Sequence, residues 1–202
     1  MPARKSRPFY VMDGDPPSKQ AILESALALF AESGVSATNV RAIGERAGYS
    51  NPAIFKFFAS KDALALYLFE RCYSRLHQVI AAALADDAAF EENLRALLEA
   101  VLALLDEDID AFLFVQDHLR EMWPRTSRAL RRKSLVRLME RFVAEGQAAG
   151  SVRGNVDAAL LSTALMGFLL QFGRVLYFGE LKGSALSRLD EVQRIAHGML
   201  AA

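Results

Sequence analysis

The stretch that most constrains the fold of this 202-residue chain is Thr38–Lys61, TNVRAIGERAGYSNPAIFKFFASK. Thr38, Ser50 and Ser60 each stand where a hydroxyl can accept hydrogen bonds from the free N–H groups at the start of a helix. Gly48 supplies the permissive backbone that a tight turn needs where a helix ends. The stretch is therefore predicted to hold two short helices joined by a turn, followed by the start of a third.

The two short helices are expected over residues 40–47 and 51–57. The second carries more amide, ammonium and aromatic groups than so small a core can bury, so some of these groups must face outward. Two short helices, a glycine turn and such an outward face are typical of a helix-turn-helix that reads DNA. The residues predicted to contact DNA are Thr38, Arg41, Ser50, Asn51, Ala53, Phe55, Lys56 and Lys61.

The run AGYSNPAIFKFFASKDAL, preceded by AIGER, resembles the DNA-binding domain of the TetR (tetracycline-repressor) family over roughly residues 18–66. The sequence departs from the family pattern at Phe55 and Phe57, where the family usually or often has Tyr, and at Ala59, which replaces its Pro. A phenyl ring still packs on a sugar or a thymine methyl, but it cannot donate a hydrogen bond to a phosphate. The resemblance implies a transcriptional regulator, usually a repressor, whose C-terminal bundle holds a pocket for a small effector that weakens DNA binding.

Helical periodicity without any strand pattern predicts an all-α fold. We expect residues 1–17 to form a flexible basic arm, which is either a solvated tail or a contact to phosphates and the minor groove. Residues 18–64 are expected to form the helix-turn-helix domain, and residues 65–202 a domain for ligand binding and dimerisation. A continuous helix over residues 60–84 is expected to join the two domains. The other helices are predicted over residues 18–33, 90–105, 111–123, 125–150, 158–178 and 187–200.

The segment over residues 158–178 is apolar around almost its whole circumference, which predicts burial on all sides. A membrane span is the rival interpretation, but Gln171 and Arg174 interrupt the segment. Together with the amphipathic segment 187–200, it is expected to form a four-helix interface in a homodimer that binds a near-palindromic operator in double-stranded DNA. The predicted interface residues are Leu161, Leu165, Phe168, Leu189, Val192 and Ile195.

A small-molecule site needs a mostly apolar cavity with a few polar groups. The candidate lining residues are Phe112, Gln116, His118, Met122, Trp123, Phe168, Gln171, Phe172, Arg174 and Tyr177. Aromatic and methionine side chains at helical spacing also build an ordinary core, so both interpretations stay open. The effector of this pocket is expected to be an apolar or amphipathic small molecule.

Composition bears on several other function classes. The formal net charge is zero, and residues 1–62 hold eight Lys and Arg against six Asp and Glu, a weak sign of a DNA-binding head on a neutral body. Cys72 and three scattered His form no metal-ligand cluster, and no phosphate loop, HExxH or nucleophile elbow supports an enzyme. We expect no cofactor, no metal and no membrane insertion, and a cytoplasmic location, since no signal peptide is visible. The alternatives are a DNA-binding dimer without an effector, and a helical enzyme or membrane-associated protein with a coincidental motif.

Overall fold

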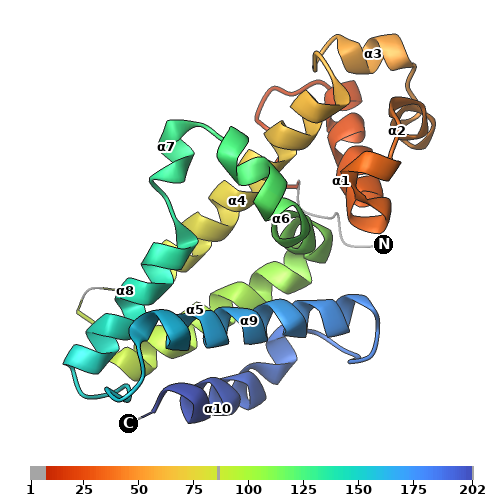
Figure 1. Cartoon of the computed structure of the whole chain (residues 1–202). Helices are drawn as coiled ribbons and strands as arrows, with labels where there is room; N and C mark the ends of the chain where they lie inside the picture. The colour runs from red at the N-terminus through yellow and green to blue at the C-terminus, as the bar shows by residue number, and fades with distance from the viewer. Residues whose placement is uncertain (1–7, 86, 202) are drawn as a thin grey trace. The chain divides into compact units, whose positions relative to one another are not determined.

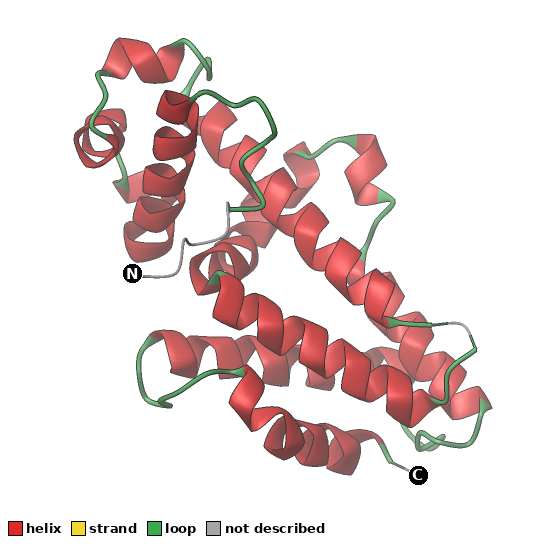
Figure 2. Cartoon of the chain, turned by 180° about the vertical axis from the view of Figure 1, so that it is seen from behind, coloured by secondary structure: helices red, strands yellow, loops and turns green. Residues whose placement is uncertain are grey.

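The computed structural model describes residues 8–85 and 87–201. Within these residues the chain consists of helices and loops, without a β-strand (Figures 1 and 2), which confirms the all-α prediction. The chain divides into two compact units. The head unit comprises the chain up to Arg75 together with Phe114–Thr126, and the body unit comprises Leu76–Leu113 and the chain from Ser127 onward. The head unit is thus larger than the predicted domain over residues 18–64, because it takes in the next turns of one helix and part of another.

The head unit is built on three N-terminal helices and on parts of two others. Its helices are α1 (Pro17–Ala37), α2 (Val40–Ala47), α3 (Asn51–Phe55), the first part of α4 (Lys61–Ala83), the second part of α6 (Ile109–Met122) and a 3-10 turn (Trp123–Arg125). The core side chains Ile22, Phe30, Ile43, Ile54 and Leu64 are fully buried. Helices α2 and α3 both contact α1 (Figure 1). Each of the two short helices is held there by one apolar stripe.

The connection from α1 to α2 differs from the prediction. Gly34 interrupts α1 with φ 80° and ψ 158°, so the break was predicted at the right residue, although one more turn follows it. Thr38 does not cap α2: its buried hydroxyl donates to the carbonyl oxygen of Gly34 at 2.8 Å. Asn39 is the cap instead, because its Oδ1 accepts a hydrogen bond from the N–H of Ala42 at 2.8 Å. The prediction that Thr38 caps α2 is therefore wrong by one residue, although the predicted start of the helix at residue 40 is correct.

Residues 8–16, which the sequence predicts as part of a flexible arm, are tied to α4. Tyr10 and Val11 are buried. Arg71 Nη2 donates to the carbonyl oxygen of Phe9 at 3.3 Å, and the guanidinium of Arg75 lies 5.9 Å from the centre of the Phe9 ring. The flexible-arm prediction is wrong for this part, because apolar burial and two arginines hold it. The basic part of the arm, within residues 1–7, lies outside the described residues.

The body unit contains the longer helices of the chain. They are the end of α4, α5 (Phe90–Glu107), the start of α6, α7 (Arg128–Arg131), α8 (Leu135–Ala148), α9 (Ala158–Tyr177), a 3-10 turn (Leu186–Arg188) and α10 (Leu189–Leu200). Helix α9 packs along α8, and α10 packs on α5 and α9 (Figure 1). Asp106 at the end of α5 fixes the turn before α10, since its carboxylate accepts hydrogen bonds from the N–H groups of Ala185 and Leu186 at 2.7 and 3.0 Å.

The single helix predicted over residues 125–150 is wrong, because two serines divide it. Ser127 Oγ accepts a hydrogen bond from the N–H of Leu130 and so starts α7. Ser134 Oγ accepts one from the N–H of Arg137 and starts α8. Serine competes in this way with the helical backbone, and it therefore favours the first position of a helix over the middle.

Helix α9 is not buried on all sides as predicted. Leu161, Leu165 and Phe172 are buried on one face, whereas Leu160 is 66% exposed and Phe178 is 72% exposed on another. By length and composition α9 could cross a membrane, and 33% of its most apolar window is buried in this chain. One face of α9 is therefore left open by the rest of this chain.

Candidate nucleic-acid interface

The turn between α2 and α3 depends on two glycines. Gly48 closes α2 in the left-handed conformation, with φ 75° and ψ 26°. The Tyr49 N–H donates to the carbonyl oxygen of Gly44 at 2.9 Å, and a Cβ added at Gly44 would lie 2.6 Å from the carbonyl oxygen of Tyr49. Only glycine at position 44 permits this approach of the two backbones, which sets the angle between the helices.

The outer face of α3 carries the polar and aromatic groups that the sequence predicts. Ile54 points into the core, whereas Ser50, Asn51 and Lys56 are exposed and the Phe55 ring is 50% exposed. Ala53, the remaining predicted contact on this helix, is half-buried. Amide and ammonium groups on the first turns of a short helix are able to donate to base edges in the major groove, and an exposed ring can pack on a thymine methyl. These five predicted contacts therefore lie on one short segment with one open face.

Arg41 lies in the first turn of α2 and is exposed. Its Nε donates to Glu45 Oε1 at 2.8 Å, and this hydrogen bond, together with the negative charge of Glu45, raises the pKa of Arg41 above its usual value. Such an exposed ion pair is weak. The guanidinium can therefore exchange the carboxylate for a DNA phosphate at little cost.

Lys61 has a structural role that the sequence did not reveal. Its Nζ donates to the carbonyl oxygens of Val35 and Thr38, at 2.6 Å each. These contacts tie the start of α4 to the connection between α1 and α2. A phosphate contact by Lys61 stays a prediction, and it would compete with these two carbonyl groups. The same holds for Thr38, whose hydroxyl is turned toward α1.

Two residues near this face were missed by the sequence reasoning. Tyr49, in the turn between the helices, is 37% exposed, and Asn39, the cap of α2, is also exposed. A tyrosine hydroxyl is a phosphate donor of the kind that Phe55 lacks. The signal was present in the sequence, because a residue between Gly48 and the first residue of α3 has no helix face to be buried on.

Residues 22–68 match the family model described as bacterial regulatory proteins, tetR family. The N-terminal segment of the chain is a TetR-type DNA-binding domain. The protein is a DNA-binding transcriptional regulator, and the family resemblance in the sequence is confirmed. The match covers α1 to α3 and the first turns of α4, which are the elements that present the outer face of α3.

Full-length comparisons extend the likeness beyond the head unit. The transcriptional repressor AcnR of Corynebacterium glutamicum is 29% identical over 201 residues, which cover 93% of this chain and 96% of that protein. The solved structure of KstR2, a ketosteroid transcriptional regulator of Mycobacterium tuberculosis, has a TM-score of 0.75 at 19% identity, with 98% and 100% of the two chains covered. The regulator FadR of Bacillus subtilis in complex with stearoyl-CoA has a TM-score of 0.69 at 18% identity, with 90% and 98% covered. At these identities the structures establish the fold.

The ten residues predicted for an effector pocket of this chain are divided between the two units. In the head unit, Met122 is buried, Gln116 is half-buried and the half-buried Trp123 ring lies 4.7 Å from that of Tyr73. His118 is half-buried there and has a second role. Its Nε2 accepts a hydrogen bond from the Val35 N–H at 3.3 Å, while its Nδ1 lies 3.0 Å from the Phe114 carbonyl oxygen. A neutral ring that donates from Nδ1 satisfies both contacts.

In the body unit, Phe112 and Phe172 are buried, Phe168, Arg174 and Tyr177 are half-buried, and Gln171 is exposed. Phe112 packs against Gly173, where an added Cβ would lie 3.1 Å from its ring. The pocket assignment stays a prediction for all ten residues.

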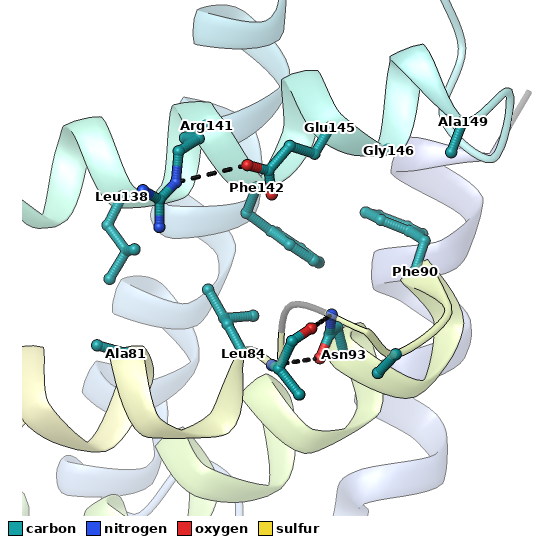
Figure 3. Close-up of a pocket in the computed structure, with 12 residues that line it drawn as sticks. Ala81, Leu84, Phe90, Asn93, Leu138, Arg141, Phe142, Glu145, Gly146 and Ala149 are labelled. Atoms are coloured by element: carbon teal, nitrogen blue, oxygen red, sulfur yellow. Dashed lines mark hydrogen bonds and ion pairs between the residues drawn. The ribbon is translucent and has the colours of Figure 1, made fainter.

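A cleft of about 600 Å³ lies elsewhere in the body unit, between the end of α4, the start of α5 and α8 (Figure 3). The described residues that line it include none of the ten. Its walls are formed by Ala81, Leu84, Ala85, Ala88, Phe90, Asn93, Leu138, Arg141, Phe142, Glu145, Gly146 and Ala149. Among the described residues, no three His, Cys, Asp or Glu side chains gather into a possible metal site.

The predicted dimer interface is partly wrong, because three of its members are used inside the chain. Leu161, Leu165 and Val192 are buried, Phe168 and Leu189 are half-buried, and Ile195 is 50% exposed. Periodicity identified two apolar helices but not the face that stays open, since α8, α9 and α10 decide by their mutual packing which stripe is covered.

Proposed function

We propose that this TetR-family regulator is a homodimeric repressor that an effector with a long apolar chain releases from a near-palindromic operator. The observation that carries the DNA-reading part is the open face of α3, held by the close contact between Gly44 and Tyr49. The repressor assignment is supported by the likeness to AcnR, and the effector class by the likeness to FadR with stearoyl-CoA. We also propose that the protein acts in the cytoplasm, where its operator lies.

Dimerisation is supported by an unpaired stripe on α9. Leu160, Ala164, Gly167, Gln171 and Phe178 are exposed and follow one another at helical spacings of three, four or seven. Residues so spaced share one face of a helix. Two small residues in the middle allow a close approach of a symmetry mate, and Ile195 adds exposed apolar surface on α10. A second copy would cover this stripe, and two heads about 34 Å apart would reach successive major grooves.

The test combines sedimentation with an operator shift assay. Leu160→Asp and Phe178→Asp should each convert the dimer to a monomer at micromolar concentration and abolish retardation of the operator fragment. Val136→Asp is the matched control, since Val136 is 53% exposed on α8 and lies away from the stripe. A wild-type protein that sediments as a monomer would contradict the dimer, and one that binds all DNA fragments equally would contradict the operator.

The alternative function is a DNA-binding dimer without an effector. Helix α4 runs without a break from the head unit into the body unit. A ligand that displaces α4 in the body unit would therefore also displace its turns in the head unit. A ligand shifts the DNA-binding equilibrium only through its different affinities for the two states, and operator DNA must weaken effector binding by the same factor. Effector titrations with and without operator should therefore differ. Identical affinities in the two titrations would favour the alternative.

A further inference from the structure

The cleft in the body unit has two apolar walls that belong to different helices (Figure 3). Leu84 and Phe90 line it from the end of α4 and the start of α5, and Leu138 and Phe142 line it from α8. The rings of Phe90 and Phe142 stack with their centres 4.8 Å apart and an angle of 13° between their planes. A volume of about 600 Å³ lies within the range of small-molecule sites, so the cleft has room for a flexible chain.

The polar groups of the cleft restrict what its ligand can be. The Asn93 amide is already used, since its Oδ1 accepts from the N–H of Ala85 at 2.9 Å and its Nδ2 donates to the carbonyl of Ala85 at 2.8 Å. The remaining charged pair is Arg141 and Glu145, whose Nε and Oε1 are 3.6 Å apart with both side chains mostly exposed. An ion pair this long and this exposed holds Arg141 weakly. The guanidinium is therefore available for an anionic group at the rim.

Further cations precede Arg141 in the sequence. Residues 127–141 contain five Arg and one Lys against a single acid, Glu140. The field of these cations reaches α4: burial lowers the pKa of His77, and the charge of Lys133 lowers it further. His77 lies one helical turn before Ala81, a residue of the cleft wall. The α8 side of the cleft thus favours negative charge despite Glu140 and Glu145, whereas Asp87, Glu91 and Glu92 stand beside the lining residues Ala88 and Phe90 on the opposite side.

We propose that this cleft binds the acyl chain of an anionic amphiphile, with the chain along the Phe90–Phe142 pair and the acidic head group on Arg141. The inference rests on the proposed function, because it names the site and the chemical class of its effector. A fatty acid and an acyl thioester of a phosphorylated carrier share this chemistry. The cations of residues 127–141 would add contacts to the phosphate groups of the acyl thioester.

The binding test uses palmitate, palmitoyl-CoA, hexadecanol and free CoA, each titrated calorimetrically into the full-length protein. Arg141→Gln should weaken palmitate binding about tenfold, because a charge-assisted hydrogen bond is lost. Hexadecanol binding should stay the same in this variant, since the alcohol brings no anion. Arg137→Gln is the matched control for palmitate, because Arg137 is an exposed neighbour outside the cleft lining. Tighter binding of palmitoyl-CoA than of palmitate would identify the acyl thioester as the source of the chain.

A steric variant tests the location of the chain. Ala81→Phe adds a ring to the cleft wall and should lower the affinity for palmitate, palmitoyl-CoA and hexadecanol at least tenfold, whereas Ala82→Phe, on the exposed neighbouring position, should not. If circular dichroism shows that Ala81→Phe does not fold, Leu138→Asn replaces it as the test. This change makes the α8 wall of the cleft polar and should weaken binding of the apolar chain. Unchanged palmitate affinity in the folded cleft variants, or no acyl binding by the wild type, would overturn the proposal.

Operator affinity without ligand, measured in parallel, separates this inference from the proposed function. Wild-type protein that binds the operator but no acyl compound refutes the cleft assignment and leaves the DNA-binding function intact. Wild-type protein that binds palmitate in the cleft but releases no operator supports the site and refutes the effector mechanism.

Discussion

The turn between α2 and α3 and the outer face of α9 use small and apolar residues in opposite ways. At the turn, Gly44 has no room for a side chain, and the neighbouring backbone fills the space. On α9, a Cβ added at Gly167 would meet no described atom within 4 Å, and large apolar side chains nearby are exposed. The first arrangement is complete within one chain, whereas the second leaves apolar surface that the proposed dimer would cover. Local sequence therefore defines the DNA-reading segment better than it defines the partner-facing one.

The largest effect is expected from Gly44→Ala. The new Cβ would lie 2.6 Å from a backbone oxygen, which cannot move aside as a flexible side chain can, so the turn between the helices must shift. We expect a loss of about 1–3 kcal/mol in the free energy of unfolding, as for overpacked cores, together with loss of specific operator binding. Urea unfolding and an operator shift assay measure the two effects. Gly154→Ala is the control in the body unit, since no described atom lies within 4 Å of its added Cβ.

Lys61→Ala should have the next largest effect, because it leaves the carbonyl groups of Val35 and Thr38 without their ammonium donor. Hydrogen bonds to charged groups contribute about 1.5–3 kcal/mol, and the partial exposure of Lys61 places the expected loss at the low end. Lys56→Ala is the matched control: its exposed side chain should leave stability unchanged but alter the preference among bases. The salt dependence of operator binding then decides on the phosphate contact, which requires a shallower slope in Lys61→Ala.

Asp106 offers a smaller effect in the body unit. Burial alone would raise the pKa of its carboxyl, but hydrogen bonds from the Ser184 hydroxyl and from the N–H groups of Leu186 and Ala185 outweigh burial and lower it. Because the folded-state pKa lies below the unfolded value of about 3.9, the stabilisation is present above that pH and is lost as the pH falls through the folded value. Asp106→Asn should therefore lower stability at neutral pH and flatten its decline on acidification.

Thermal unfolding of the Asp106→Asn variant between neutral pH and pH 3 measures this difference. Asp190→Asn is a suitable control, since the Asp190 side chain is mostly exposed and forms an ion pair with Arg95 at the surface. An equal decline of stability with pH in wild type and Asp106→Asn would contradict the role of Asp106.

Much of the fold followed from the sequence where a local rule decides the outcome. The bounds of α2 were predicted to the residue, because Gly48 ends it and its apolar residues repeat at helical spacing. The cap of α2 was misassigned to Thr38, since a hydroxyl and an amide compete for the same capping position and only the packing of α1 resolves the choice. The break at Ser134 was missed for a related reason, because a serine in a basic helical run gives no periodicity signal.

The sites could be predicted less evenly. The exposed groups of α3 followed from a core too small to hold them, and Asn51, Phe55 and Lys56 do face outward. The cleft was not foreseen, because its walls come from three helices whose lateral arrangement leaves no trace in any one of them. The same limit explains Leu165: hydrophobicity marks it for burial but does not say whether its own chain or a second copy buries it.

The contact between His118 and Val35 makes one backbone amide a reporter on the segment that leads from α1 into the DNA-reading helices. The Val35 N–H has the imidazole Nε2 as its acceptor, and a His118→Phe substitution would remove that acceptor. Amide hydrogen exchange at Val35 should therefore accelerate in the His118→Phe variant, while the exchange of the Tyr49 amide, which bonds to a carbonyl in the turn, should stay unchanged. The same amide would register any ligand-induced movement of the second part of α6 before DNA affinity itself is measured.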